Sequence, residues 1–173
     1  NEQWNLAMAR VAREVWPNCL IVFGGPQVPE RQAEAFLDEH SYVNILVHQE
    51  GEIAFASILR AWLKRPILTS LPLGVVYRGG ILSQTVCTGP AQRIQDLSAL
   101  PSPYLAGVFD GMPWGDYELH AIQETHRGCF AECTMCAWGS LVFAKIRAFG
   151  DERIDAEYEW CAKHKIDLLY NAD

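Results

Sequence analysis

The chain has 173 residues, half of them hydrophobic, which is enough for one compact core or for parts of two. Its formal net charge is −7 and it has no Lys/Arg cluster, so we expect a small-molecule or peptide partner and no nucleic acid. No apolar run is long enough for a membrane span and no signal sequence opens the chain, which favours a soluble protein.

The first half of the chain alternates helical and strand-like patterns. Four apolar residues recur at helical spacing before Pro17: Trp4, Met8, Val11 and Val15. They predict an amphipathic helix. Beyond Pro17 the pattern predicts strands at 19–23 and 43–47 and helices at about 29–40 and 53–64. Such an alternation is typical of an open parallel sheet.

The second half begins with a change of pattern. Gly79-Gly80 separates two short β-prone runs, which predicts a hairpin that closes the first domain. Residues 89–118 are rich in proline and glycine and are typical of an ordered linker. A strand at 119–125, a helix at 151–163 and a strand at 166–170 then open a second βαβ unit. Because neither domain is complete, we expect the chain to be a segment of a longer protein.

Three cysteines are bunched directly after the strand at 119–125. They form a C-x3-C-x2-C pattern: Cys129, Cys133 and Cys136. Thiolates on so tight a loop can face one centre, as the ligands of iron–sulfur clusters do. A closed structural metal site uses four protein ligands, so three leave one metal position open for a substrate or cosubstrate. The other cysteines are scattered and predict no disulfide framework, which favours a reducing cytoplasm.

The stretch "RGCFAECTMCAWGS" (127–140) resembles the signature of radical S-adenosylmethionine (radical SAM) enzymes. In that family three cysteines hold a 4Fe–4S cluster, and S-adenosylmethionine binds its fourth iron. The resemblance implies that the three bunched cysteines bind the cluster and that Met135 and Trp138 contact S-adenosylmethionine. Met135 stands where members usually carry an aromatic residue. The alternative from the residues themselves is a zinc site with His126 as the fourth ligand.

The whole chain resembles the cobalamin (B12)-binding radical SAM family, through its α/β domain, its hairpin, the linker segment "LPSPYL" and the cysteine loop. "VFGGPQVPE" resembles the glycine pair that lines the cobalamin nucleotide tail, and "HQEGE" resembles the family's GEGE loop. The resemblance implies that six residues bind cobalamin: Gly24, Gly25, Gln49, Glu50, Gly51 and Glu52. Both loops follow strands, at the edge where open α/β sheets bind ligands. "WN" at Trp4-Asn5 resembles the end of the preceding strand and loop.

Plainer interpretations stay open for these residues. Glycine pairs close many strand–helix turns for backbone reasons only. Glu50 and Glu52 are also compatible with a helix N-terminus, where carboxylates favour the helix dipole. Trp4 is compatible with the core. Asp173 follows the last predicted strand and is suitably located for a polar contact. Arg147 is compatible with a contact to a substrate or cofactor carboxylate or with a solvated charge.

The resemblance implies an α/β fold: part of a Rossmann-like parallel-sheet cobalamin-binding domain (1–88), a linker (89–118) and the first βαβ unit of a partial (β/α) radical SAM barrel (119–173). It implies an enzyme, a methyltransferase that acts on an unactivated carbon through a 5′-deoxyadenosyl radical and methylcobalamin, with a reductant such as flavodoxin or ferredoxin. The segment alone is expected to be inactive, and no residue is assigned a catalytic role. Alternatives are a cyclase or rearrangement enzyme without methyl transfer, and a non-catalytic zinc module.

Overall fold

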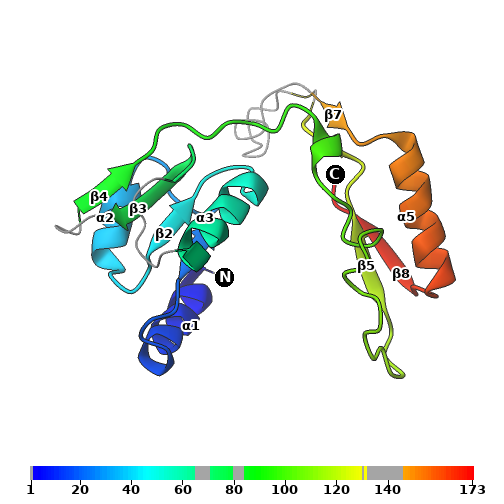
Figure 1. Ribbon diagram of the computed structural model, residues 1–173, viewed down its shortest axis with the longest axis horizontal. Coiled ribbons are helices and arrows are strands. Elements are labelled where there is room, and N and C mark those ends of the chain that lie inside the picture. The colour runs from blue at the N-terminus through cyan, green and yellow to red at the C-terminus, as the bar shows by residue number, and fades with distance from the viewer. Residues whose placement is uncertain (1, 65–70, 80–83, 130, 132–145) are drawn as a thin grey trace. The chain divides into compact units, whose positions relative to one another are not determined.

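The computed structural model describes residues 2–64, 71–79, 84–129, 131 and 146–173. The chain divides into two compact units, the first ending at Arg93 and the second starting at Ile94 (Figure 1). Within the described ranges, no helix is long and apolar enough to cross a membrane.

The first unit is a four-stranded sheet with the strand order β1-β2-β3-β4 and with helices between its first strands. Its elements are α1 (Glu2–Val15), β1 (Val22–Gly24), α2 (Ala33–Glu39), β2 (Ile45–Val47), α3 (Glu52–Lys64), β3 (Val75–Gly79) and β4 (Gln84–Cys87). β1 and β2 are parallel, whereas β3 pairs antiparallel with both β2 and β4. The predicted α/β class and the parallel strand pair are therefore confirmed. β3 and β4 pair antiparallel, as the predicted hairpin requires, and its turn at 80–83 lies outside the described residues.

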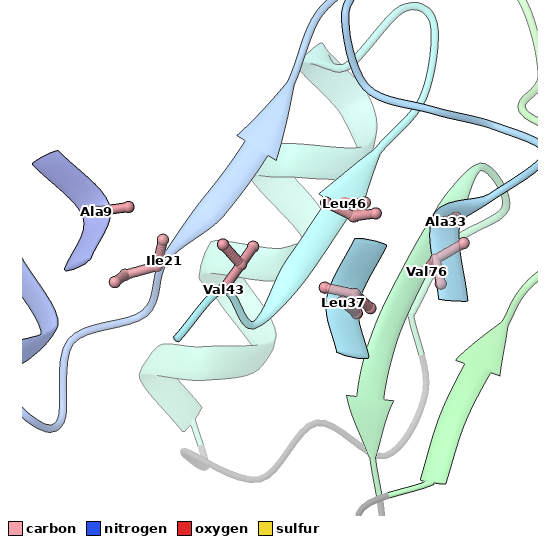
Figure 2. Close-up of a cluster of buried hydrophobic side chains, with 7 residues drawn as sticks. All are labelled: Ala9, Ile21, Ala33, Leu37, Val43, Leu46 and Val76. Atoms are coloured by element: carbon pink, nitrogen blue, oxygen red, sulfur yellow. The ribbon is translucent and has the colours of Figure 1, made fainter. Parts of the chain in front are cut away.

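Both faces of this sheet are covered, which explains why β2 has no polar residue. Leu46 lies in one apolar cluster with Leu37 of α2 and Val43, shown in Figure 2. Ile45 and Val47 lie on the opposite face, in a cluster that includes Ile58 of α3. Side chains alternate between faces along a strand, so a strand buried on both sides must be apolar at every position.

Helix α1 buries a different face from the one that its apolar stripe predicts. Leu6 and Ala9 are buried, whereas Trp4 is 68% exposed. The other members of the stripe are also exposed: Met8, Val11 and Val15. The interpretation of Trp4 as a core residue is therefore wrong, and Trp4-Asn5 lies within a helix and not at the end of a strand.

Arg13 gives the physical reason for this orientation. It lies on the same helical face as Leu6 and Ala9, and its guanidinium donates to the backbone oxygens of Pro17 (2.6 Å), Cys19 (2.8 Å) and Tyr42 (3.0 Å) and to the side chain of Asn44 (2.5 Å). The planar five-donor fork of arginine suits several fixed acceptors at once. These bonds hold the face that carries Arg13 toward the sheet.

Helix α2 is shorter than the sequence predicts, since it begins at Ala33 and not near residue 29. The preceding residues form turns, one of them closed by the bond from the amide of Val28 to the carbonyl of Gly25 (3.1 Å). The amide of Phe36 bonds to the carbonyl of Gln32 (2.9 Å), so helical hydrogen bonding starts at Gln32, and the residues before it belong to the bend and turn segment that follows β1.

The second unit contains the predicted strand–helix–strand unit. β5 (His120–Gln123) and β8 (Leu168–Asn171) are parallel and α5 (Asp151–Lys163) precedes β8. A short helix, η1 (Leu97–Ala99), and an antiparallel pair, β6 (His126–Arg127) with β7 (Arg147–Ala148), complete its described elements. The pair β6–β7 has no counterpart among the predicted elements.

Two groups of contacts fix β5 within this unit. The buried carboxylate of Glu157 in α5 accepts hydrogen bonds from Gln123 (3.2 Å) and Arg153 (3.0 Å). At the strand edge, the hydroxyl of Tyr104 donates to the carbonyl of Ile122 (2.6 Å) and accepts from its amide (3.0 Å). Strand β5 is therefore held on one side by a helix and at its edge by the preceding segment.

Candidate functional site

The two loops proposed for cobalamin leave the same edge of the first sheet. Gly24, the last residue of β1, pairs in parallel register with Val47, the last residue of β2. The loops that follow are joined by a hydrogen bond from Gln49 Nε2 to Glu30 Oε1 (3.3 Å). The edge formed by carboxyl ends of parallel strands is where open α/β sheets bind ligands. The sequence-predicted residues of this group are therefore close together.

The two glycines of the pair have different requirements. Gly25 has φ +97°, a conformation that L side chains rarely adopt, and a Cβ there would have no atom within 4 Å. Gly24 has no such constraint, and a Cβ there would lie at an ordinary 3.6 Å from the carbonyl oxygen of Val47. The backbone requires glycine at Gly25 but not at Gly24.

Gln49, in the loop after β2, also has a positive φ angle. It stands at the first glycine position of the GEGE pattern and has φ +57°, in the left-handed region that glycine adopts freely. The residue type therefore departs from the pattern while the backbone keeps the conformation.

His48 is a residue of this edge that the sequence reasoning did not single out. It follows β2 directly, only 8% of it is exposed, and its Nε2 atom has no hydrogen-bond partner among the described residues. A buried polar atom without a partner is unusual in proteins. In the sequence, the feature that could have indicated His48 is its place between a buried strand and a glycine loop.

The two acidic residues of the second loop lie in different surroundings. Glu50 forms an ion pair with Arg93 at 3.7 Å, and both side chains are less than one-fifth exposed, at 16% and 18%. Glu52 is the first residue of α3, where a carboxylate stabilises the helix dipole. Gly51 lies between them, and a Cβ there would be 3.4 Å from Val47 Cγ1. The plainer interpretation of Glu52 as a helix-start residue therefore fits its position.

In the second unit, the ends of the segment that carries the bunched cysteines are tied together. His126 pairs with Ala148 and Arg127 with Arg147 in the β6–β7 ladder. The amide of Phe149 extends this contact by donating to the carbonyl of Thr125 (2.9 Å). These bonds define the base of the cysteine loop, which comprises residues 125–127 and 147–149.

Cys129 is the cysteine of the motif that the structure describes. Its thiol is free and half-buried, and the amide of Ala131 lies 3.4 Å from Sγ as a donor. Gly128, directly before it, has φ +117°, which explains the glycine in "RGC". Hydrogen bonds to sulfur are typical of the thiolates that hold iron–sulfur clusters. The Cys129 thiol also faces the carbonyl oxygen of Ala131 as a donor, at 3.7 Å.

The other predicted ligands and contacts of this centre lie outside the described residues: Cys133, Met135, Cys136 and Trp138. In the part of the chain that is described, no three or more His, Cys, Asp or Glu side chains are arranged to hold a metal ion.

Charged side chains fix the residues that precede Cys129. Arg127 donates from Nε and Nη2 to the two carboxylate oxygens of Glu124, at 2.7 and 2.9 Å. A bidentate pair of this kind sets the orientation of both side chains. On the other strand of the ladder, Arg147 donates to the carbonyl of Ile94, which gives its charge a structural role.

Asp173 lies just beyond β8 and bonds to the end of β5. Its Oδ1 accepts from the amides of Thr125 (2.5 Å) and His126 (3.0 Å), its Oδ2 accepts from the Thr125 hydroxyl (2.5 Å), and His126 Nδ1 is 3.3 Å from Oδ2. Burial raises the pKa of Asp173, but the bonds from Thr125, His126 and Asn171 outweigh burial and hold that pKa at about 2. The carboxylate is therefore ionised at neutral pH.

Comparison with curated proteins gives the family. The cobalamin-dependent radical SAM methyltransferase TokK of Streptomyces tokunonensis and the 2-(S-pantetheinyl)-carbapenam-3-carboxylate methyltransferase of Streptantibioticus cattleyicolor are each 40% identical to the chain over 179 residues. Both alignments cover 98% of this chain and 26% of the relative, so the chain spans about a quarter of their length.

A third relative is more distant. An uncharacterized methyltransferase of Pyrococcus horikoshii is 28% identical over 94% of the chain and 35% of its own length. No family model matches the chain. The two alignments at 40% identity run through both units, and the chain belongs to the cobalamin-binding radical SAM enzyme family.

Proposed function

We propose that the protein that carries this sequence is a cobalamin-dependent radical SAM methyltransferase that acts on an unactivated carbon. The observation that carries the proposal is the 40% identity, over 98% of the chain, to two proteins named as methyltransferases. The bound cofactors supply the chemistry, a 5′-deoxyadenosyl radical from S-adenosylmethionine and a methyl group from methylcobalamin, and the protein holds them and excludes water. A flavodoxin or ferredoxin supplies electrons, and a reducing cytoplasm keeps the thiols free.

In this proposal residues 119–173 hold the cluster. Cys129, Cys133 and Cys136 are its ligands, and Met135 and Trp138 contact S-adenosylmethionine. The free thiol of Cys129, the amide that faces its sulfur and the tied base of the cysteine loop support this assignment. Pre-positioned ligands lower the entropic cost of binding, so a tied base favours cluster capture.

Residues 1–88 hold cobalamin through the two loops at the edge of β1 and β2, and residues 89–118 link the two domains. Gly24 has ordinary backbone geometry and no side chain, which leaves room for close approach of the nucleotide tail. Gly25 and the segment Gln49–Glu52 form the turns that present backbone groups at the same edge. Residues 1–173 by themselves are proposed to be inactive.

One observation favours a second candidate, a structural zinc site. Zinc-binding histidines usually direct their second ring nitrogen at a carboxylate. His126 Nδ1 lies 3.3 Å from Asp173 Oδ2 and 3.1 Å from Thr125 Oγ1, which leaves Nε2 as the ring nitrogen for a metal ion. This arrangement suits zinc held by His126 and the three bunched cysteines.

An isotope experiment tests the methyltransferase proposal. The complete protein is reconstituted anaerobically with iron, sulfide and cobalamin, then given a reductant and S-adenosylmethionine labelled in its methyl group. The first substrate to test is 2-(S-pantetheinyl)-carbapenam-3-carboxylate, because the name of one relative specifies it. Labelled methyl in the product, absent with the Cys129→Ala variant, supports the proposal. 5′-Deoxyadenosine without methylated product contradicts methyl transfer to this substrate, and a zinc-loaded protein contradicts the enzyme class.

A further inference from the structure

Asp173 joins two segments that are far apart in the sequence. It lies at the carboxyl end of the parallel pair β5–β8 and bonds to Thr125 and His126, nearly fifty residues earlier in the chain. These two residues are the first part of the base of the cysteine loop, and Cys129 follows His126 by three positions. The carboxylate therefore acts on the segment that leads into the cysteines.

The bonds of Asp173 occupy it within the protein. Oδ1 accepts hydrogen bonds from the backbone amides of Thr125 and His126. Oδ2 accepts a hydrogen bond from the Thr125 hydroxyl and also faces His126 Nδ1. The side chain is only 14% exposed. A carboxylate with this many donors is fixed in orientation and has little remaining capacity for a ligand.

The backbone pairing between the two ends of the cysteine loop is short. The β6–β7 ladder has two residue pairs, and one further amide, that of Phe149, bonds to Thr125. These contacts join the two ends of the loop to each other. Asp173 differs because it fixes one end relative to the strand β8.

We propose that Asp173 is a positioning residue, which holds Thr125 and His126 so that the cysteine loop is set in place for a 4Fe–4S cluster. The inference rests on the proposed function, because it assumes that the bunched cysteines bind such a cluster. It assigns to Asp173 no contact with cluster, cosubstrate or substrate.

The chain contains a matched control at the opposite end of the same strand pair. Asp167 Oδ2 accepts the amide of Leu119 at 2.8 Å, so this carboxylate also joins the β8 side to the β5 side, but at the amino ends of the strands. Loss of Asp167 weakens the pairing without touching the base of the cysteine loop. Asp167→Ala therefore measures the effect of strand pairing alone.

The test compares Asp173→Ala with Asp167→Ala in the complete protein. After anaerobic reconstitution, iron and sulfide per chain are measured together with the rate of cluster loss to an iron chelator. We expect about ten-fold faster loss for Asp173→Ala, since charge-assisted hydrogen bonds are removed, and a rate near that of the wild type for Asp167→Ala. Equal rates in wild type and Asp173→Ala, or equally fast loss in both variants, overturn the proposal.

A second variant covers the case in which Asp173→Ala fails to fold. Thr125→Val keeps the shape of the side chain and removes the hydroxyl, which donates to Asp173 Oδ2 and lies 3.1 Å from His126 Nδ1. Hydrogen exchange of the peptide 119–129 in the cluster-free protein should rise in this variant, and its cluster loss should be faster. Unchanged exchange and unchanged loss would contradict the positioning role.

The outcomes separate this inference from the proposed function. A wild-type protein that takes up zinc, or no iron and sulfide, contradicts the proposed function and with it the inference. A wild-type protein with an iron–sulfur cluster that Asp173→Ala retains equally well leaves the proposed function standing and overturns the inference alone.

Discussion

The glycine pair at the end of β1 allows the backbone and the ligand roles of glycine to be separated. Gly25→Ala places a methyl group where no atom lies within 4 Å, so its whole cost comes from the backbone at φ +97°. Gly24→Ala places a methyl group in ordinary contact with Val47. The two variants therefore add the same methyl group at neighbouring positions, and only the backbone at Gly25 has a conformation that disfavours it.

The expected magnitudes follow from these two environments. An L residue in the left-handed region costs about 1–2 kcal/mol, and the lower entropy of the unfolded chain returns about 0.4–1 kcal/mol. We therefore expect Gly25→Ala to lower the free energy of unfolding by about 1 kcal/mol. Gly24→Ala gains the same entropic term without backbone strain, so its free energy of unfolding should equal or slightly exceed that of the wild type.

Denaturant unfolding followed by circular dichroism measures both effects, with equal m-values as the check that the unfolded states are comparable. Cobalamin retention is then measured for Gly24→Ala, which is expected to lose cofactor while keeping its stability. A Gly25→Ala variant as stable as the wild type, or a Gly24→Ala variant less stable than Gly25→Ala, would refute the reasoning from φ.

Three further measurements test the account. Gln49→Gly should leave the free energy of unfolding unchanged or raise it by up to about 1 kcal/mol because φ is +57°, whereas Gln84→Gly in β4 should lower it by about 0.5–1 kcal/mol in the same unfolding assay. The pKa of Asp173, about 2, lies below the ordinary 3.8, so its ionised form stabilises the fold above about pH 4. Its contribution to the free energy of unfolding, about 1 kcal/mol once solvent screening is taken into account, should disappear as the pH falls from about 4 to about 2. When the free energy of unfolding is measured against pH, the Asp173→Ala variant should lack this step. Leu37→Ala, at a fully buried position, should cost about 2–5 kcal/mol by thermal or denaturant unfolding, while Leu63→Ala, at a position 83% exposed, should change stability by less than about 0.5 kcal/mol.

Local patterns in the sequence predicted the elements whose signals are local. The bounds of α5 agree with the predicted 151–163. The apolar runs predicted parallel strands correctly because β2 is buried on both faces and is therefore apolar at every position. The place of the two candidate cobalamin loops at one sheet edge also followed, since parallel neighbours present their carboxyl ends together.

The features that the sequence did not predict depend on distant partners. The orientation of α1 depends on acceptors of Arg13 as far away as Asn44, and an apolar stripe carries no information about them. The β6–β7 ladder is too short to produce a periodic pattern. The bonds of Asp173 join residues 47 and 48 positions apart, which no local pattern records.

Metal analysis of the anaerobically reconstituted complete protein tests the central claim most directly. The account predicts a coloured protein with about four iron and four sulfide per chain, and the loss of both in Cys129→Ala. A colourless protein that holds about one zinc ion per chain, and loses it in a His126→Ala variant, would contradict the account.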